Sequence, residues 1–248
     1  MRRSTRTRWL IVALAAALIT SVAAGAPTVL RRFDSFQVDH VSIRGTRYLA
    51  ADVALAQSGI SRKSNVFDDF EPWRQRLLKH PMILAARIER RLPGTILIAI
   101  TETEPVALAR TPDLTPVDAR AKALPIDPAT ADLDLPVLSM SSHPNARGDF
   151  TDRATRQVVS ILALLQQRDA RLYSWISQAG PMPDHGVRLE LRSPAGAQAL
   201  VSGEARALRL HELQIALADL AARGELSRLQ RIDARFHDQI VVALRNRN

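Results

Sequence analysis

The chain has 248 residues, no cysteine, and 34 Lys plus Arg against 25 Asp plus Glu, which gives a formal net charge of +9. This length suffices for one or two packed domains, and a hydrophobic fraction of 46% excludes an intrinsically disordered chain. The lack of cysteine excludes disulfide frameworks, thiolate metal sites and thiol nucleophiles.

The N-terminal segment is typical of a membrane span. Residues 9–26 form a run of 18 residues without a charge, and a helix of this length rises about 27 Å, close to the hydrocarbon thickness of a bilayer. Arginines at positions 2, 3, 6 and 8 precede it, which places the N-terminus in the cytoplasm. We therefore predict a cytoplasmic tail over 1–8 and a transmembrane helix over 9–30.

A cleaved secretory signal is the alternative interpretation of this segment. The sequence Val22-Ala23-Ala24 resembles the small-residue cleavage site of such a signal. The segment alone does not decide between a retained anchor and a cleaved signal. Under both alternatives residues 31–248 are exported.

The positive charge of the exported part does not indicate a nucleic-acid ligand. Residues 31–248 hold 30 basic and 25 acidic residues, so their surplus is 30 minus 25, or +5. Aromatic residues are few at 4%, and no stacking-platform motif accompanies the basic residues. We predict no binding of nucleic acid.

The first exported region predicts the element order β-α-α-β-β. A strand is expected over 36–43, with a change of phase at its centre, and a first helix over 49–59 that ends at a glycine. A second helix begins at a proline and covers 72–80. Strands over 83–91 and 95–103 are joined by a Leu-Pro-Gly turn. The strand over 95–103 is apolar on both faces, which predicts a central, buried position.

The second exported region, 105–248, begins with a proline-rich stretch. Its short apolar segments predict strands over 115–118 and 135–138. Thr151 is expected to cap a helix whose apolar face includes Val158 and Leu162. Three further strands are expected, over the ranges 173–178, 187–191 and 198–201.

The last part of the chain predicts a helix followed by a hairpin. The helix covers 204–222 and ends at Gly224, and its leucine seam favours packing on a sheet because two heptads are too few for a coiled coil. Strands are then expected over 229–236 and 240–244, with a turn between them.

No catalytic or metal-binding constellation is present in the sequence. His211-Glu212 begins like a zinc protease helix, but Ile215 stands where the second histidine ligand is required. The adjacent Asp68-Asp69 pair is better explained by a solvated turn, and no nucleophile elbow or phosphate loop occurs. We predict no catalytic residue, no metal, no cofactor and no enzymatic activity, which leaves binding as the function class.

The final strand predicts a place where a partner binds. If 240–244 is the last strand of its sheet, one backbone edge has no internal partner, and an apolar edge without proline aggregates unless it is covered or used. A strand from another protein would satisfy the open N–H and C=O groups. The alternative is that this strand is paired internally or shielded by residues 246–248.

Several motifs together resemble one family. The first region reads FQVDHVSIRG, then LLKHP, RIERRLPGT and TETEPVALAR, and the C-terminal part reads IDARFHDQIVVAL. In this order behind a single span, they resemble the FtsQ (DivIB) family of bacterial cell division proteins and cover most of 33–245. The chain has Asp118-Ala119-Arg120 where that family tends to have a glycine turn.

The resemblance implies an α+β protein with a single N-terminal transmembrane helix. A POTRA domain is implied over 33–104, and a mixed α/β domain with a mainly antiparallel sheet over 105–248. It also implies a single-pass inner-membrane scaffold at the division septum, with 31–248 in the periplasm. The runner-up function is a POTRA-containing envelope protein for outer-membrane protein assembly or secretion, and a periplasmic hydrolase with an unrecognised site ranks third.

The resemblance also implies partners. The end of the second domain is expected to recruit bitopic division proteins of the FtsB and FtsL type, and the POTRA domain is expected to contact other division proteins. Carried over by motif, the partner-binding candidates are Arg235, Phe236, Gln239, Ile240, Val241, Val242, Ala243 and Leu244, with Tyr173 and Trp175 as weaker candidates.

Overall fold

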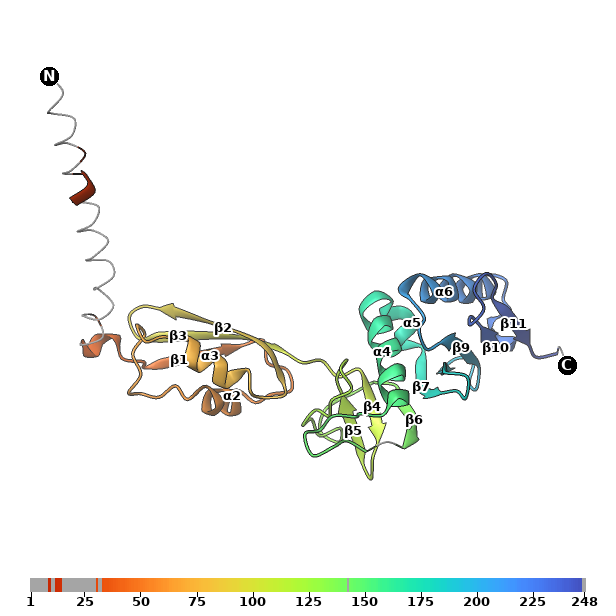
Figure 1. Ribbon diagram of the computed structural model, residues 1–248, viewed down its shortest axis with the longest axis horizontal. Helices are drawn as coiled ribbons and strands as arrows, with labels where there is room; N and C mark the ends of the chain where they lie inside the picture. The colour runs from red at the N-terminus through yellow and green to blue at the C-terminus, as the bar shows by residue number, and fades with distance from the viewer. Residues whose placement is uncertain (1–8, 10–11, 15–29, 31–32, 142, 247–248) are drawn as a thin grey trace, which may run out of the picture. The chain divides into compact units, whose positions relative to one another are not determined.

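The structure is a computed structural model that describes residues 9, 12–14, 30, 33–141 and 143–246 (Figure 1). The predicted tail over 1–8, the small-residue cleavage site and most of the predicted membrane helix over 9–30 lie outside these residues. Among the described residues, no helix has both the length and the apolar character that crossing a membrane requires.

The chain divides into two compact units, Met1–Glu102 and Thr103–Asn248. The described elements of the first unit are η1 (Asp34–Phe36), β1 (His40–Arg44), α2 (Ala51–Ser58), α3 (Glu71–Leu77), β2 (Ile83–Arg91) and β3 (Thr95–Glu102). Their sheet has the order β1-β3-β2, with β1 parallel and β2 antiparallel to β3. The predicted order β-α-α-β-β is confirmed.

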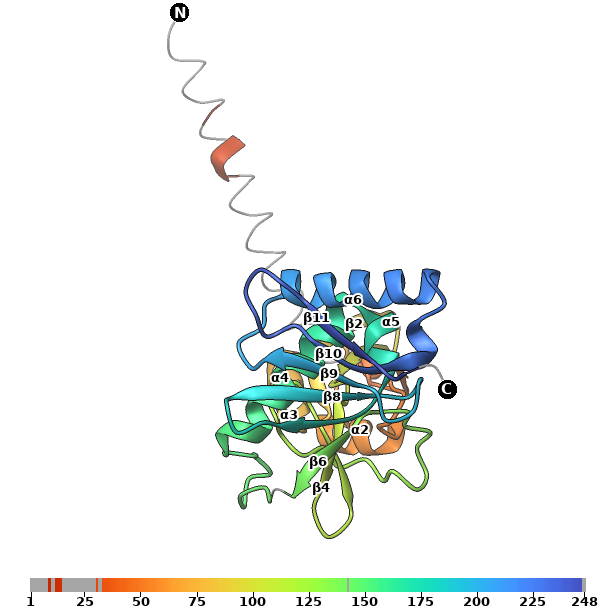
Figure 2. The same cartoon turned by 90° about the vertical axis from the view of Figure 1, so that its right-hand side faces the viewer.

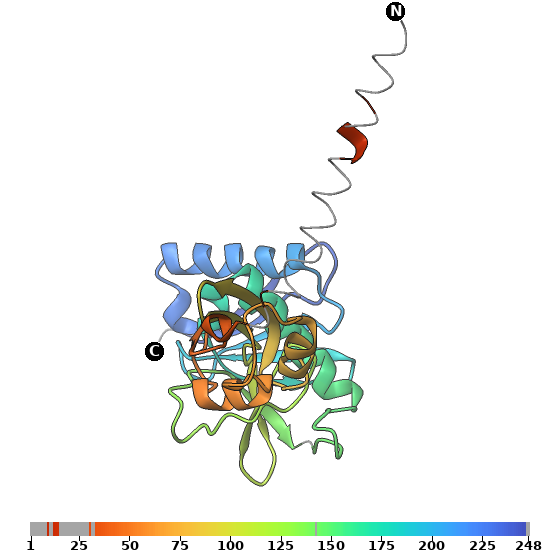
Figure 3. The ribbon, with the colours of Figure 1, turned by 90° about the vertical axis from the view of Figure 1, so that its left-hand side faces the viewer.

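The two helices of the first unit cover the sheet. Helix α2 packs against β1, α3 packs against β2, and the two helices contact each other (Figure 3). Under them lie the buried side chains Ile96, Ile98 and Ile100 of β3. The prediction that this strand is buried on both faces holds for Leu97 but is wrong for Ala99, which is exposed because no element covers the outer face there.

Glycine and proline set the limits of these elements. Gly45 follows β1 with φ of 84°, and a Cβ atom there would lie 2.1 Å from the carbonyl oxygen of Ile100, so only glycine fits. Proline occupies the first turn of α3, where its missing N–H costs no helical hydrogen bond. The strand expected from residue 36 begins only at His40, because 34–36 form a 3-10 turn instead.

The second unit contains one large sheet. Its described strands are β4 (Ala107–Arg110), β5 (Leu114–Val117), β6 (Val137–Ser141), β7 (Ile176–Pro181), β8 (Gly186–Leu191), β9 (Gln198–Ser202), β10 (Leu229–Asp233) and β11 (Val241–Leu244). They lie in the order β11-β10-β9-β8-β7-β6-β4-β5 (Figure 2). Of the neighbouring pairs, β9-β10, β6-β7 and β4-β6 are parallel and the other four are antiparallel. The sheet is therefore mixed rather than mainly antiparallel.

Helices α4 (Arg153–Arg168), α5 (Ala170–Ser174) and α6 (Ala207–Ala222) share one core with this sheet, and η2 (Leu226–Arg228) leads into β10. The leucine seam of α6 is buried in that core, as the sequence predicts. This packing anchors the C-terminal hairpin of β10 and β11, because Leu229 and Ile232 of β10 are buried in the same cluster.

Three local predictions for the second unit are wrong. The cap of α4 is Asp152, whose carboxylate accepts the Thr155 N–H at 2.7 Å, and not Thr151. Tyr173 belongs to α5, because the Asp169 carboxylate caps a short helix there, so strand β7 begins three residues later than expected. Strand β4 was not expected, because it has only four residues and begins two residues after Pro105.

Candidate protein-docking edge

Strand β11 is an edge strand of the eight-stranded sheet. It pairs with β10 alone, and Val241, Val242 and Ala243 lie opposite Asp233, Ile232 and Arg231. Among the strands that the structure describes, none pairs with the other side of β11 (Figure 2). The predicted terminal hairpin is thus present, and its last strand has an open backbone edge within the described chain.

The side chains of β11 are apolar and half exposed. Val241 and Val242 are 47% and 37% exposed, whereas Ile240 and Leu244 pack partly against the core. Because side chains alternate along a strand, both faces next to the open edge offer apolar surface. Such an edge aggregates unless it is covered or receives a strand from another protein.

An arginine fixes the C-terminal end of β11. Arg228 donates from its Nε and Nη2 atoms to the carbonyl oxygen of Arg245 at 3.1 and 2.9 Å. The Arg245 N–H in turn donates to the carbonyl oxygen of Arg228 at 2.8 Å. The strand therefore ends in a defined position instead of fraying.

The predicted site residue Arg235 is engaged inside the protein. Its Nη2 atom lies 2.7 Å from the carboxylate of Asp233, its Nε donates to the same carboxylate at 2.9 Å, and it also pairs with Asp184. The hydrogen bond from Arg235 lowers the pKa of the Asp233 carboxyl, and the pairing raises the pKa of Arg235. Arg235 thus orders the turn after β10, while the neighbouring Phe236 side chain is exposed.

We predict that Arg235→Ala raises the pKa of Asp233 toward the ordinary value of about 3.9 for aspartate. A carboxyl whose folded pKa is depressed adds stability above its unfolded pKa, and this stability is lost as the pH falls through the folded pKa. The variant should therefore lose stability at neutral pH and show a weaker acid dependence. A carboxyl NMR titration measures the shift, with Arg231→Ala as the control because Arg231 makes the smallest contribution. An Asp233 pKa that does not change in Arg235→Ala would contradict this assignment.

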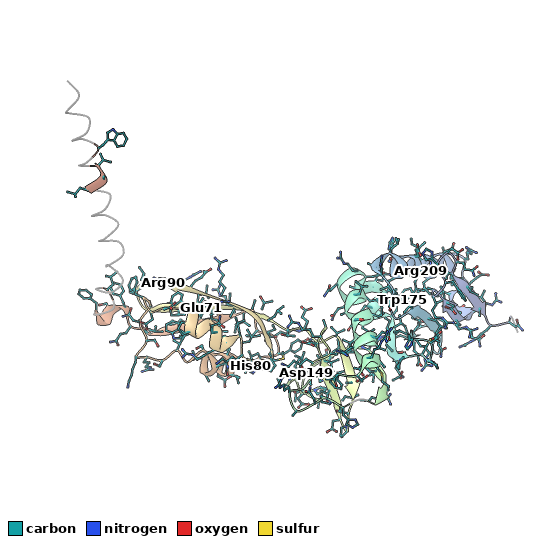
Figure 4. All side chains as sticks on the ribbon, viewed as in Figure 1. Glu71, His80, Arg90, Asp149, Trp175 and Arg209 are labelled. Atoms are coloured by element: carbon teal, nitrogen blue, oxygen red, sulfur yellow. The ribbon has the colours of Figure 1, made fainter. Side chains whose placement is uncertain are left out.

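The two weaker candidates lie away from β11. Tyr173 is buried, and its hydroxyl donates to the carbonyl oxygen of Val106 at 2.7 Å, so burial raises the pKa of this hydroxyl. We assign Tyr173 to the core rather than to the docking edge. Trp175, labelled in Figure 4, lies beneath Arg171, whose guanidinium is 5.6 Å from the ring centre, and it lines a pocket together with residues of α5 and α6.

Acidic and histidine side chains form no candidate metal site in the described residues. The Asp68-Asp69 pair supports the local backbone: Asp68 accepts the Asn65 N–H at 2.8 Å and Asp69 accepts the Glu71 N–H at 3.0 Å. These contacts agree with the interpretation of this pair as a turn.

Sequence reasoning missed two residues that shape the hairpin. Arg209 of α6 donates hydrogen bonds to the connection between β10 and β11, and Asp184 pairs with Arg235. No sequence signal marks either of them, because Arg209 stands 25 to 30 residues from the carbonyl groups that it contacts.

Comparison with known proteins agrees with the motifs. Residues 36–103 match the family model described as POTRA domain, FtsQ-type. The chain is 28% identical over 165 residues to the cell division protein FtsQ of Syntrophotalea carbinolica, which covers 66% of this chain and 58% of that relative.

Two further relatives match shorter stretches. The cell division protein DivIB of Geobacillus kaustophilus is 34% identical over 71 residues, which cover 28% of this chain and 27% of the relative. The cell division protein FtsQ of Novosphingobium aromaticivorans is 32% identical over 114 residues, covering 42% and 36%. The matches thus span less than two thirds of each relative's length. Residues 36–103 thus match a POTRA domain of the FtsQ type, and the chain is similar to cell division proteins named FtsQ and DivIB.

Proposed function

We propose that this chain is a non-catalytic scaffold of bacterial cell division that binds partner proteins through the open edge of β11. The observation that carries the proposal is this edge, which ends an eight-stranded sheet and presents Val241 and Val242 to solvent. The matched relatives are named cell division proteins, which supports the division role.

Strand addition is the binding mode that this geometry favours. A partner strand beside β11 would pair with its outward N–H and C=O groups, and alternate side chains of that strand would contact the two valines. The partners that we propose are bitopic division proteins of the FtsB and FtsL type. The POTRA domain is proposed to contact other division proteins.

The proposed location follows from the sequence of the N-terminal segment. Residues 9–30 would anchor the chain in the inner membrane with the N-terminus in the cytoplasm, and residues 31–248 would act in the periplasm at the septum. A partner that is itself anchored beside the chain meets the docking edge at a high effective concentration, so a short strand interface suffices.

Depletion of the protein from growing cells tests this function. We expect long filaments without constricted septa, and a functional fluorescent fusion of the full chain should gather at the division site. Normal division, combined with a defect in outer-membrane protein assembly or secretion, would refute the division role and favour an envelope-assembly function of the POTRA domain instead.

A further inference from the structure

One side chain of α6 contacts both sides of the connection between β10 and β11. Arg209 donates from Nε to the carbonyl oxygen of Ala234 at 3.0 Å and from Nη2 to the carbonyl oxygen of Gln239 at 2.5 Å. The same Nη2 atom also donates to the carbonyl oxygen of Phe236. Three carbonyl groups from both sides of the turn therefore converge on one guanidinium, that of the side chain labelled Arg209 in Figure 4.

The guanidinium is held in place and largely shielded. The Arg209 side chain is 17% exposed, and its Nη1 atom pairs with Glu212 one turn further along α6. Helix α6 is itself fixed, because Leu210 and Leu213 are buried in the core. Arg209 thus links the turn to α6. The backbone pairing of the sheet connects β11 to β10 and not to this helix.

This contact lies next to the start of β11. Gln239 stands two residues before Val241, the first residue of the strand, and β11 joins the sheet through β10 alone. Arg228 fixes the other end of the strand at Arg245. The strand is short, so the positions of its two ends decide whether its open edge is straight and ordered before a partner arrives.

We propose that Arg209 is a positioning residue for docking, which holds the turn so that the β11 edge is ordered in advance. The proposal rests on the proposed function of that edge. An edge that is ordered before binding loses less conformational entropy when the partner strand pairs with it, so the affinity is higher. Arg209 touches no partner in this role; it acts through the backbone of 234–241.

The chemistry of the contact requires arginine. The planar guanidinium presents several N–H donors in a fixed fork, whereas a lysine ammonium is a compact point charge on a flexible stem. Arg209→Lys keeps the attraction to Glu212 but cannot serve the three carbonyl groups in the same geometry. Arg209→Ala removes both, and leaves the three carbonyl groups without this donor.

The experiment uses the full chain with Arg209→Ala and Arg209→Lys. Arg223→Ala is the matched control, because Arg223 lies at the C-terminal end of the same helix in an ion pair with Asp219 and its side chain is 62% exposed. Leu220→Ala is the stability control, since Leu220 is buried under the distal half of α6. Each variant is co-expressed with the FtsB-type and FtsL-type proteins of the same genome, and the captured amount is measured together with amide hydrogen exchange.

In Arg209→Ala we expect the amides of 237–244 to exchange at least tenfold faster and the captured amount of the partners to fall at least tenfold. Arg209→Lys should give intermediate values for both quantities, and Arg223→Ala should give values like those of the unaltered chain. Leu220→Ala should lower the Tm but keep capture at temperatures well below that Tm, which separates positioning from stability.

Two results would overturn the positioning role: unchanged exchange over 237–244 in Arg209→Ala, or loss of capture in Leu220→Ala equal to that in Arg209→Ala. A parallel Val242→Asp variant separates this proposal from the proposed function. If Val242→Asp loses capture and Arg209→Ala keeps it, only the positioning role of Arg209 fails. If Val242→Asp keeps capture, the docking edge itself is wrong.

Discussion

Val242→Asp is expected to weaken capture of the proposed partners at least tenfold while the fold stays intact. In the free protein this side chain is 37% exposed at the edge of the sheet, so water can solvate the new carboxylate. A partner strand that pairs with β11 would remove this water, and an unpaired buried charge is costly. A tenfold change corresponds to about 1.4 kcal/mol, which is modest for a side chain in the centre of an interface.

Leu114→Asp is the matched control for this variant. Leu114 begins β5, the strand at the opposite edge of the same sheet, and its side chain is 43% exposed. Both substitutions therefore place the same charge at a sheet edge of similar exposure. Capture is measured by titration of the purified partner proteins, and the fold by circular dichroism and Tm. Equal capture by Val242→Asp and the unaltered chain would contradict docking at β11, and equal losses in both variants would show that the effect is general.

Much of the first unit could be predicted from local signals. Proline in the first turn of α3, Gly59 after α2 and the Leu-Pro-Gly turn between β2 and β3 each limit an element by a backbone preference that the sequence displays. The exposed Ala99 was missed because exposure of one face depends on which element covers it, and that is decided by packing.

The mixed sheet of the second unit could not be predicted in the same way. Whether β10 lies parallel to β9 depends on the path of the connection through α6 between the two strands. No residue in either strand indicates the direction of the pairing. Likewise Tyr173 could be read as part of a strand, because its apolar neighbours fit both periods. The hydrogen bond that the Leu172 N–H donates to the Asp169 carboxylate favours a helix at that point.

The docking edge also combines features that the local sequence predicts with features that depend on distant residues. The terminal hairpin is predicted by the sequence, since the polar pair His237-Asp238 separates the expected strand over 229–236 from the apolar run over 240–244. That β11 has an open edge depends on the order of eight strands. The role of Arg209 depends on backbone carbonyl groups, which every residue carries, so no side-chain pattern in the sequence predicts it.

Glu102→Ala is expected to lower the unfolding free energy of the first unit by about 2–4 kcal/mol, because two backbone N–H groups lose a charged acceptor. The Glu102 side chain is 9% exposed at the end of β3, and its carboxylate accepts the Tyr48 N–H at 2.9 Å and the Leu49 N–H at 2.8 Å. These groups belong to the segment that leads into α2, more than 50 residues earlier in the chain.

Glu102→Gln separates the charge of this contact from its geometry. The glutamine keeps one carbonyl oxygen as an acceptor and adds an NH2 group that cannot accept, so the loss should be about half of that in Glu102→Ala. Glu89→Ala is the control, since Glu89 forms an exposed pair with Arg87 and should change little. Urea titration followed by the fluorescence of the buried Trp73 reports this unit when Trp9 and Trp175 are replaced by phenylalanine. A Glu102→Ala midpoint equal to that of Glu89→Ala would show that water replaces the carboxylate at both N–H groups, and that β3 does not hold the start of α2.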